Sequence, residues 1–160
     1  MRNPKQTQIT LERNFKATLE DLWDLWTTPE GIESWWGPEG FDVKVRALDL
    51  TPGGQMLNAM TATAPDQVGF MKRVGMPLTT ETKLTYSEIV PNRRLSWATV
   101  ADFIPGVAPY DVGTSVELTA HAQGVRLVLT LDAMHDATWT QRMVAGWNGQ
   151  LGKLEKGLAA

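Results

Sequence analysis

The sequence contains no cysteine and only two histidines among its 160 residues. The lack of cysteine excludes a disulfide framework, a thiolate nucleophile and a cysteine-ligated zinc site. His121 and His135 are far apart and match no common metal-binding spacing, so we expect neither a metal nor a cofactor. The fingerprints of nucleotide-binding loops and serine hydrolases are also missing, and the sequence alone identifies no catalytic residue.

Excess positive charge and long apolar runs are missing as well. The chain has 15 lysines and arginines against 18 aspartates and glutamates, a net charge of −3, which argues against a broad basic surface for nucleic acid. No apolar run approaches the roughly 20 residues that a membrane-spanning helix needs. The N-terminal residues lead into no apolar stretch of the kind that marks a secretory signal. We therefore expect a cytoplasmic protein with no nucleic-acid partner and no membrane insertion.

The composition is that of an ordinary globular protein, with 42% hydrophobic residues, and we expect one domain over residues 1–160. Residues 7–16 alternate between apolar and polar side chains, which predicts a strand. Thr18 is a good cap for a helix that follows. Pro29 ends this helix and starts a second short one, because proline disfavours helix before it and suits a first helical position.

Alternation returns after Gly40 and predicts six more strands, so the sheet has about seven, in an antiparallel arrangement. A change of phase near Ala47 predicts a β-bulge. Asp136 then caps a long amphipathic helix over residues 139–158, whose apolar side chains recur every three or four positions. Three glycines within it would permit close approach to a neighbour or a kink. The six strands are expected near residues 41–50, 55–63, 79–90, 95–103, 112–120 and 125–131.

Several motifs resemble those of the SRPBCC superfamily, also called START-like or helix-grip proteins. Within it, the chain is similar to the bacterial branch named after the C-terminal domain of the activator of the heat-shock protein 90 ATPase. The motifs lie at residues 23–30 (WDLWTTPE), 35–41 (WWGPEGF), 49–54 (DLTPGG), 88–95 (EIVPNRRL) and 146–147 (GW). The resemblance implies an α+β helix-grip fold, in which a curved antiparallel sheet wraps a long C-terminal helix and two short helices follow the first strand.

The resemblance also implies a cavity, often apolar, between the sheet and the last helix. Aromatic rings and methionines are suited to line it, because rings supply apolar area and methionine adapts to irregular shapes. The same side chains would equally form a plain core. The candidate lining residues are Met60, Tyr86, Trp97 and Phe103 on the sheet, and Trp139, Met143 and Trp147 on the helix.

Residues 64–78 form a long connection between two predicted strands, and its length suggests a function. Pro65 and Gly75 mark the start and the end of a short helix. One hypothesis is a helical lid over the cavity entrance, and the alternative is a helix packed permanently on the edge of the sheet. The apolar lid candidates are Val68, Phe70, Met71 and Val74.

Titratable side chains give a weaker signal. His135 lies beside the helix cap at Asp136, which favours a hydrogen-bonding role at this junction. By strand geometry, four charged residues would be able to reach the cavity: Glu81, Glu88, Arg94 and Asp102. An acid–base pair needs two such groups in a shared cleft, and the sequence does not reveal one.

The leading hypothesis is therefore the binding of an apolar small molecule between the sheet and the helix, with affinity from apolar burial and orientation from a few polar groups. A second is an enzyme of the cyclase or dehydratase type that the superfamily contains, with a buried acid or tyrosine of shifted pKa. A third, which rests on the family name alone, is a protein that partners a heat-shock ATPase.

Overall fold

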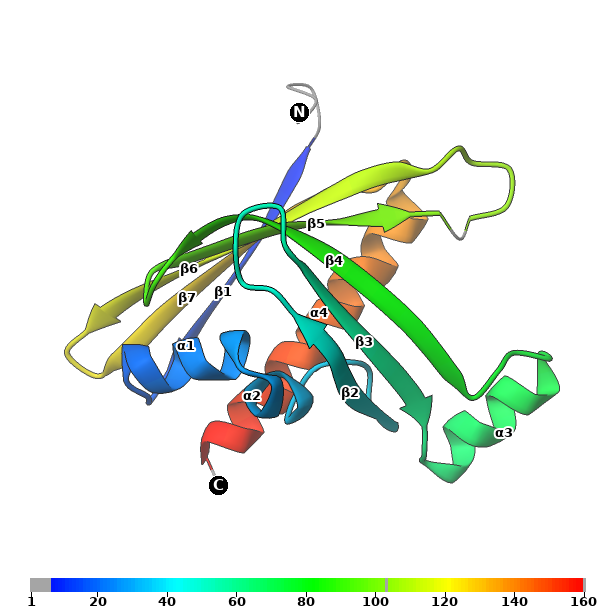
Figure 1. The fold of residues 1–160 in the computed structure, drawn as a ribbon, viewed down its shortest axis with the longest axis horizontal. Helices are drawn as coiled ribbons and strands as arrows, with labels where there is room; N and C mark the ends of the chain where they lie inside the picture. The colour runs from blue at the N-terminus through cyan, green and yellow to red at the C-terminus, as the bar shows by residue number, and fades with distance from the viewer. Residues whose placement is uncertain (1–6, 103, 160) are drawn as a thin grey trace.

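The computed structural model describes residues 7–102 and 104–159, the last of these by its backbone alone. The elements follow the order that the sequence predicts, and the segment between the third and fourth strands contains a helix (Figure 1). They are β1 (Gln8–Phe15), α1 (Leu19–Thr27), α2 (Pro29–Glu33), β2 (Phe41–Leu48), β3 (Gln55–Ala62), α3 (Pro65–Arg73), β4 (Thr79–Val90), β5 (Arg94–Ala101), β6 (Tyr110–His121), β7 (Gly124–Asp132) and α4 (Ala137–Ala159).

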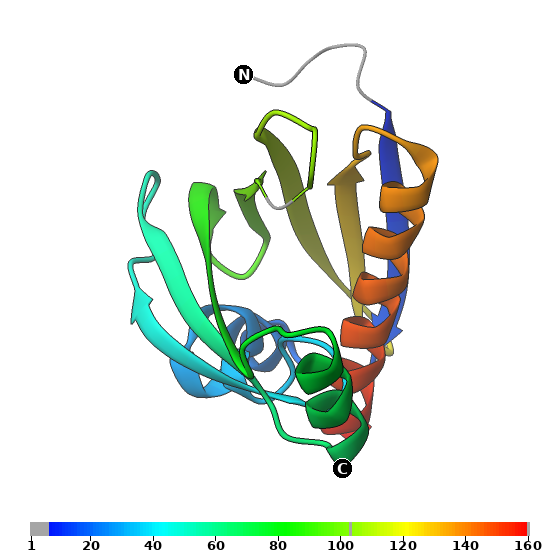
Figure 2. The same cartoon turned by 90° about the vertical axis from the view of Figure 1, so that its right-hand side faces the viewer.

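The strands form one seven-stranded antiparallel sheet in the order β1-β7-β6-β5-β4-β3-β2. Figure 2 shows that the sheet is strongly curved, with β2 and β3 on one side, β7 and β1 on the other, and α4 running lengthwise beside β1. The register shifts between Val45 and Ala47, which confirms the predicted bulge, and again between Tyr86 and Glu88. Because bulges bend a strand and increase its twist, they contribute to this curvature. The α+β helix-grip fold is thus confirmed.

The two short helices are held at a tight corner by side-chain caps. Thr18 Oγ1 accepts a hydrogen bond from the backbone N–H of Asp21 at 3.0 Å, and Thr28 Oγ1 accepts one from Gly31 at 3.0 Å. A Cβ at Gly31 would lie 2.3 Å from the carbonyl oxygen of Asp24. Only glycine therefore allows α2 to approach α1 this closely.

The long helix α4 begins where predicted, with the Asp136 carboxylate accepting a hydrogen bond from the N–H of Trp139 at 2.8 Å. Near its other end, Lys153 Nζ donates to the carbonyl oxygens of Trp36 and Gly37 at 3.4 and 3.2 Å. A Cβ at Gly146, Gly149 or Gly152 would meet nothing within 4 Å. The close approach that we considered for these glycines is therefore wrong, because the glycine face of the helix has open space around it.

Buried apolar side chains form two clusters of unequal size. The larger contains the buried residues of α1, α2, β7 and the C-terminal half of α4. The smaller consists of Ala101, Ile104 and Val112, against which Trp139 and Met143 pack. Met143 also packs on the larger cluster and so lies between the two.

Candidate ligand site between the sheet and the C-terminal helix

Five tryptophans meet beneath the C-terminal half of α4. Trp26 comes from α1, Trp35 and Trp36 follow α2, Trp97 lies on β5 and Trp147 on α4. The ring centroids of Trp26 and Trp35 are 4.5 Å apart, and Trp26 stacks on Trp147 at 6.1 Å with an interplanar angle of 11°. Trp36 and Trp97 complete the cluster, with centroids 6.3 Å apart. These separations are typical of favourable aromatic pairs, so the rings contribute packing energy beyond their buried area.

A small cavity of about 10 Å³ remains inside this cluster. That volume is close to the minimum that one water molecule requires. Within the described chain, Trp26 Nε1 is the one fully buried side-chain nitrogen or oxygen that has no hydrogen-bond partner. The neighbouring Trp35 Nε1, by contrast, donates to the carbonyl oxygen of Leu25 at 2.7 Å. The cavity is lined by Trp26, Ile32, Trp36, Met56, Leu84, Tyr86, Leu95 and Trp97.

Tyr86 brings a second polar group to the same cavity. The residue is 3% exposed, and burial raises the pKa of its phenol. Its hydroxyl makes no hydrogen bond to any residue that the structure describes, whereas its backbone N–H and carbonyl pair with Gly54 and Gly53. The residues that line the cavity therefore include three indoles and one phenol, each of which carries a hydrogen-bond donor.

The N-terminal half of α4 lies on the sheet more loosely. Trp139, Met143 and Val144 are half-buried there, and Trp147 is the first buried residue of the helix. The Arg142 guanidinium lies over the Trp139 ring, 4.8 Å from its centroid. Met60 on β3 is also half-buried, but its sulfur would be 3.3 Å from a Cβ at Gly37, whose backbone N–H donates to Gln150 in the C-terminal half of α4.

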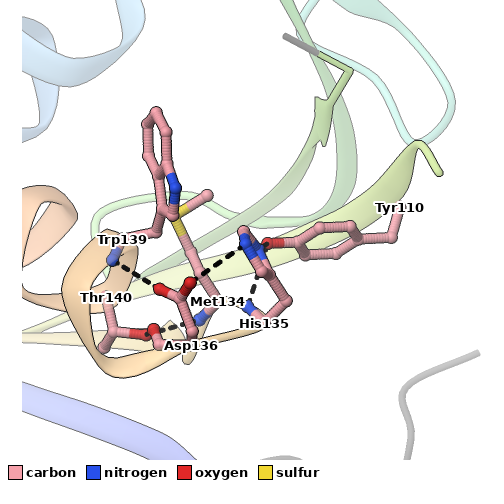
Figure 3. Close-up of polar contacts among 6 residues, drawn as sticks. All are labelled: Tyr110, Met134, His135, Asp136, Trp139 and Thr140. Atoms are coloured by element: carbon pink, nitrogen blue, oxygen red, sulfur yellow. Dashed lines mark hydrogen bonds and ion pairs between the residues drawn. The ribbon is translucent and has the colours of Figure 1, made fainter. Parts of the chain in front are cut away.

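A compact hydrogen-bonded corner fixes the start of α4 (Figure 3). The Tyr110 hydroxyl accepts from the backbone N–H of His135 at 3.0 Å, so its own proton is free to point at His135 Nδ1, 2.8 Å away. With Nδ1 as the acceptor, the ring proton lies on His135 Nε2, which faces the Asp136 carboxylate at 3.4 Å. The junction role that we predicted for His135 is confirmed, because both ring nitrogens are used within the corner.

The predicted lining residues are brought together only in part. Tyr86, Trp97 and Trp147 belong to the larger buried cluster, and Met143 packs against it, whereas Trp139 belongs to the smaller one. Phe103 lies outside the described residues. Sequence reasoning missed Trp26, although its spacing from the buried Leu22 and Trp23 on one helix places all three on the inner face. A ligand contact for any of these residues remains a prediction.

The lid segment is a helix, α3, which contacts β3 and buries Met71. Val68 is half-buried, whereas Phe70 and Val74 are 47% and 51% exposed. Whether this helix moves remains a prediction.

The charged residues considered for the cavity lie elsewhere. Arg94 pairs with Glu88 and, at 2.5 Å, with Glu117, and the hydrogen bond that the Arg94 guanidinium donates to Glu88 raises its pKa. Glu81 and Asp102 are exposed. In the part of the chain that the structure describes, no three histidine or carboxylate side chains are placed to hold a metal ion.

A separate surface groove of about 430 Å³ lies between α1, the end of α2 and the last turns of α4. Burial lowers the pKa of Lys153 in its wall. No sequence pattern pointed to this groove. It is lined by Asp21, Asp24, Leu25, Ser34, Trp35, Lys153, Leu154, Gly157 and Leu158.

A curved antiparallel sheet that holds a long C-terminal helix defines the helix-grip class of α+β proteins. A family model described as "Activator of Hsp90 ATPase homolog 1-like protein" matches residues 16–159, and the chain belongs to this family. The fold is of the START/SRPBCC type. No curated protein matches the chain. No helix of the described residues is long and apolar enough to cross a membrane.

Solved bacterial structures have the same fold. Protein CV1439 from Chromobacterium violaceum is 25% identical with a TM-score of 0.76, and the match covers 96% of this chain and 97% of that one. The AHSA1-like protein from Aeromonas hydrophila is 21% identical with a TM-score of 0.72 and 95% coverage of both chains. A protein from Arthrobacter aurescens is 18% identical with a TM-score of 0.74, covering 99% of this chain and 90% of that one.

Proposed function

We propose that this protein binds a small, largely apolar molecule that carries one hydrogen-bond acceptor, in the space between the sheet and α4. The observation that carries the proposal is the buried, unpartnered indole N–H of Trp26, a residue that lines the cavity together with other aromatic side chains. Leaving a buried donor unpaired costs about 1–3 kcal/mol. An acceptor atom of a bound ligand would recover this cost.

Entry of a ligand requires one side chain of the cluster to move, because the cavity itself holds no more than one water. Trp36 is the best candidate. It is half-buried, whereas the other four rings of the cluster are buried, and it lies in the irregular segment between α2 and β2. Its displacement would join the cavity to the half-exposed apolar surface of Met60 and Met143.

The test uses two planar probes that differ by one acceptor, 1-indanone and indane. In a sample labelled with ¹⁵N at the seven tryptophan indoles, we expect 1-indanone to shift the Trp26 Nε1–H resonance downfield. One neutral hydrogen bond predicts that 1-indanone binds about tenfold more tightly than indane. Trp36→Ala, which enlarges the cavity, should strengthen the binding of both probes, whereas the matched change Trp139→Ala at the other end of α4 should not.

The proposal fails if neither probe binds wild type or Trp36→Ala, or if the shifts are confined to Trp139. Trp26→Phe assigns the resonance and serves as the control without the donor.

A second candidate function, proton-transfer catalysis of the cyclase or dehydratase type, is favoured by Tyr86. A buried, protonated phenol is able to donate a hydrogen bond to a ligand carbonyl while a water molecule accepts the α-proton and the enol forms. In this case the protein would accelerate exchange of the α-protons of 1-indanone in D₂O, and Tyr86→Phe would abolish the acceleration while leaving the probe bound. Binding without accelerated exchange would support the binding protein alone.

A further inference from the structure

The end of α3 presents an unusual concentration of exposed apolar side chains. Among the described residues, five large hydrophobic side chains are exposed, and three of them lie within residues 70–76. Phe70, Val74 and Met76 are 47%, 51% and 49% exposed, respectively. Contiguous apolar surface on a folded protein marks a site of interaction. We call residues 70–76 the α3 tip.

The charge of the α3 tip is opposite to that of the whole chain. Lys72 and Arg73 are exposed between Phe70 and Val74, although the chain carries a net charge of −3. The acidic residue of the helix, Asp66, lies in its first turn, at the far end from the tip. The apolar side chains of the tip are therefore flanked by positive charge alone within the segment, which makes the tip complementary to an anionic partner.

The α3 tip lies at the open end of the molecule. The connection from β3 to β4, which contains α3, lies at the same ends of the strands as the β5–β6 connection and the start of α4. Figure 1 shows α3 projecting from this end of the sheet, away from the rest of the fold. Met71, which is buried, anchors the helix, so the neighbouring side chains are held outward.

This geometry fits a membrane surface better than a protein partner. A stable protein interface buries about 800 Å² on each side and uses some 20–30 residues, whereas the tip offers one projecting segment of seven. A convex apolar tip with flanking cations suits the headgroup–acyl boundary of an anionic bilayer. We propose that the α3 tip docks the protein on an anionic membrane surface, with Phe70, Val74 and Met76 entering this boundary and Lys72 and Arg73 contacting lipid phosphates.

The proposal is tested by sedimentation of the full chain with lipid vesicles. We expect binding to vesicles of phosphatidylglycerol and phosphatidylcholine, and little binding to phosphatidylcholine alone. Each basic residue at an anionic surface contributes roughly fivefold to partitioning, so the double variant Lys72→Gln and Arg73→Gln should lose roughly 25-fold. The triple variant Phe70→Ser, Val74→Ser and Met76→Ser should lose vesicle binding.

Two matched variants serve as controls. Val90→Ser with Val100→Ser removes exposed apolar side chains elsewhere on the sheet, and Arg93→Gln with Lys156→Gln removes two exposed cations outside the α3 tip. Both should bind vesicles like wild type, and near-ultraviolet circular dichroism verifies folding of every variant. The proposal is overturned if wild type ignores anionic vesicles, if the control pairs lose as much as the tip variants, or if the tip variants only abolish self-association measured by light scattering.

Discussion

The two halves of α4 meet the sheet in different ways. In the C-terminal half, Trp147, Leu151 and Leu154 are buried, and Trp147 stacks on a ring from α1. In the N-terminal half, Trp139 and Met143 have the same apolar character but remain half-buried. The same apolar stripe therefore gives a closed core at one end and incompletely covered surface at the other.

The difference comes from the helices that follow β1. A straight helix and a curved sheet do not touch along their full length, and large side chains must fill the gap where they part. At the C-terminal half, α1 and the segment after α2 supply Trp26, Trp35 and Trp36 for this purpose. At the N-terminal half no helix intervenes in the described structure, and the β5–β6 connection covers Trp139 only in part. Stability is thus concentrated at one end, and incompletely covered apolar surface remains at the other.

The largest expected effect is a difference in stability between two tryptophan variants. Trp97→Ala removes a buried ring from the five-tryptophan cluster and should lower the free energy of unfolding by about 3–5 kcal/mol. Trp139→Ala removes a half-exposed ring that contacts Arg142, and should cost only about 1 kcal/mol, part of it from the lost cation–π contact. Urea unfolding of both variants measures the contrast.

Equal losses for the two variants would show that the two ends are packed alike, and would contradict the comparison. Should Trp97→Ala not fold, Trp97→Phe preserves most of the ring and permits the same measurement.

Local sequence patterns predict most of the fold because each pattern has a direct physical cause. Thr18, Pro29 and Asp136 begin helices through caps or a fixed φ angle, and the phase change near Ala47 became a bulge. The bulge at Tyr86 was not predicted, although the apolar positions shift in phase there, from Leu84 and Tyr86 to Ile89. The curvature of the sheet was predicted from the family resemblance, because no single residue indicates it.

The candidate site was harder to predict because it depends on contacts between distant elements. Alternation places Tyr86 and Trp97 on the inner face, but it does not say that rings from α1 and the segment after α2 fill the space between them. The unpartnered N–H of Trp26 depends on which carbonyl groups lie nearby, as the bonded Trp35 shows. Likewise, the pattern at residues 64–78 predicts a helix without saying which of its apolar side chains faces the sheet.

The close packing around Tyr86 should also make the free energy of unfolding depend on pH in alkaline solution. Burial raises the folded-state pKa of Tyr86 above the ordinary value of about 10, so the unfolded chain loses this proton first as the pH rises. Stability is therefore complete below about pH 10 and falls above it, by up to about 1.4 kcal/mol per pH unit from this residue. Tyr86→Phe should lack this part of the decline, as urea unfolding across the alkaline range would measure.

Lys153 has the opposite effect on stability. Its pKa is lowered in the folded protein, so the folded chain loses this proton before the unfolded chain does, and stability rises with pH over that range. This contribution is the same in wild type and Tyr86→Phe, so the difference between their curves isolates the phenol. Parallel curves for the two proteins would mean that burial does not raise the pKa of the Tyr86 phenol, and that the packed end is more open than the structure indicates.

The smallest expected effect concerns the outer face of α4. A Cβ at Gly146 or Gly149 would enter open space, so replacing either glycine by alanine should raise the free energy of unfolding by about 1 kcal/mol through helix propensity alone. The same change at Gly31 should instead destabilise, since its Cβ would lie 2.3 Å from the carbonyl oxygen of Asp24. Thermal unfolding of the three single variants separates these cases. A loss of stability at Gly146 or Gly149 would mean that another surface covers this face of α4.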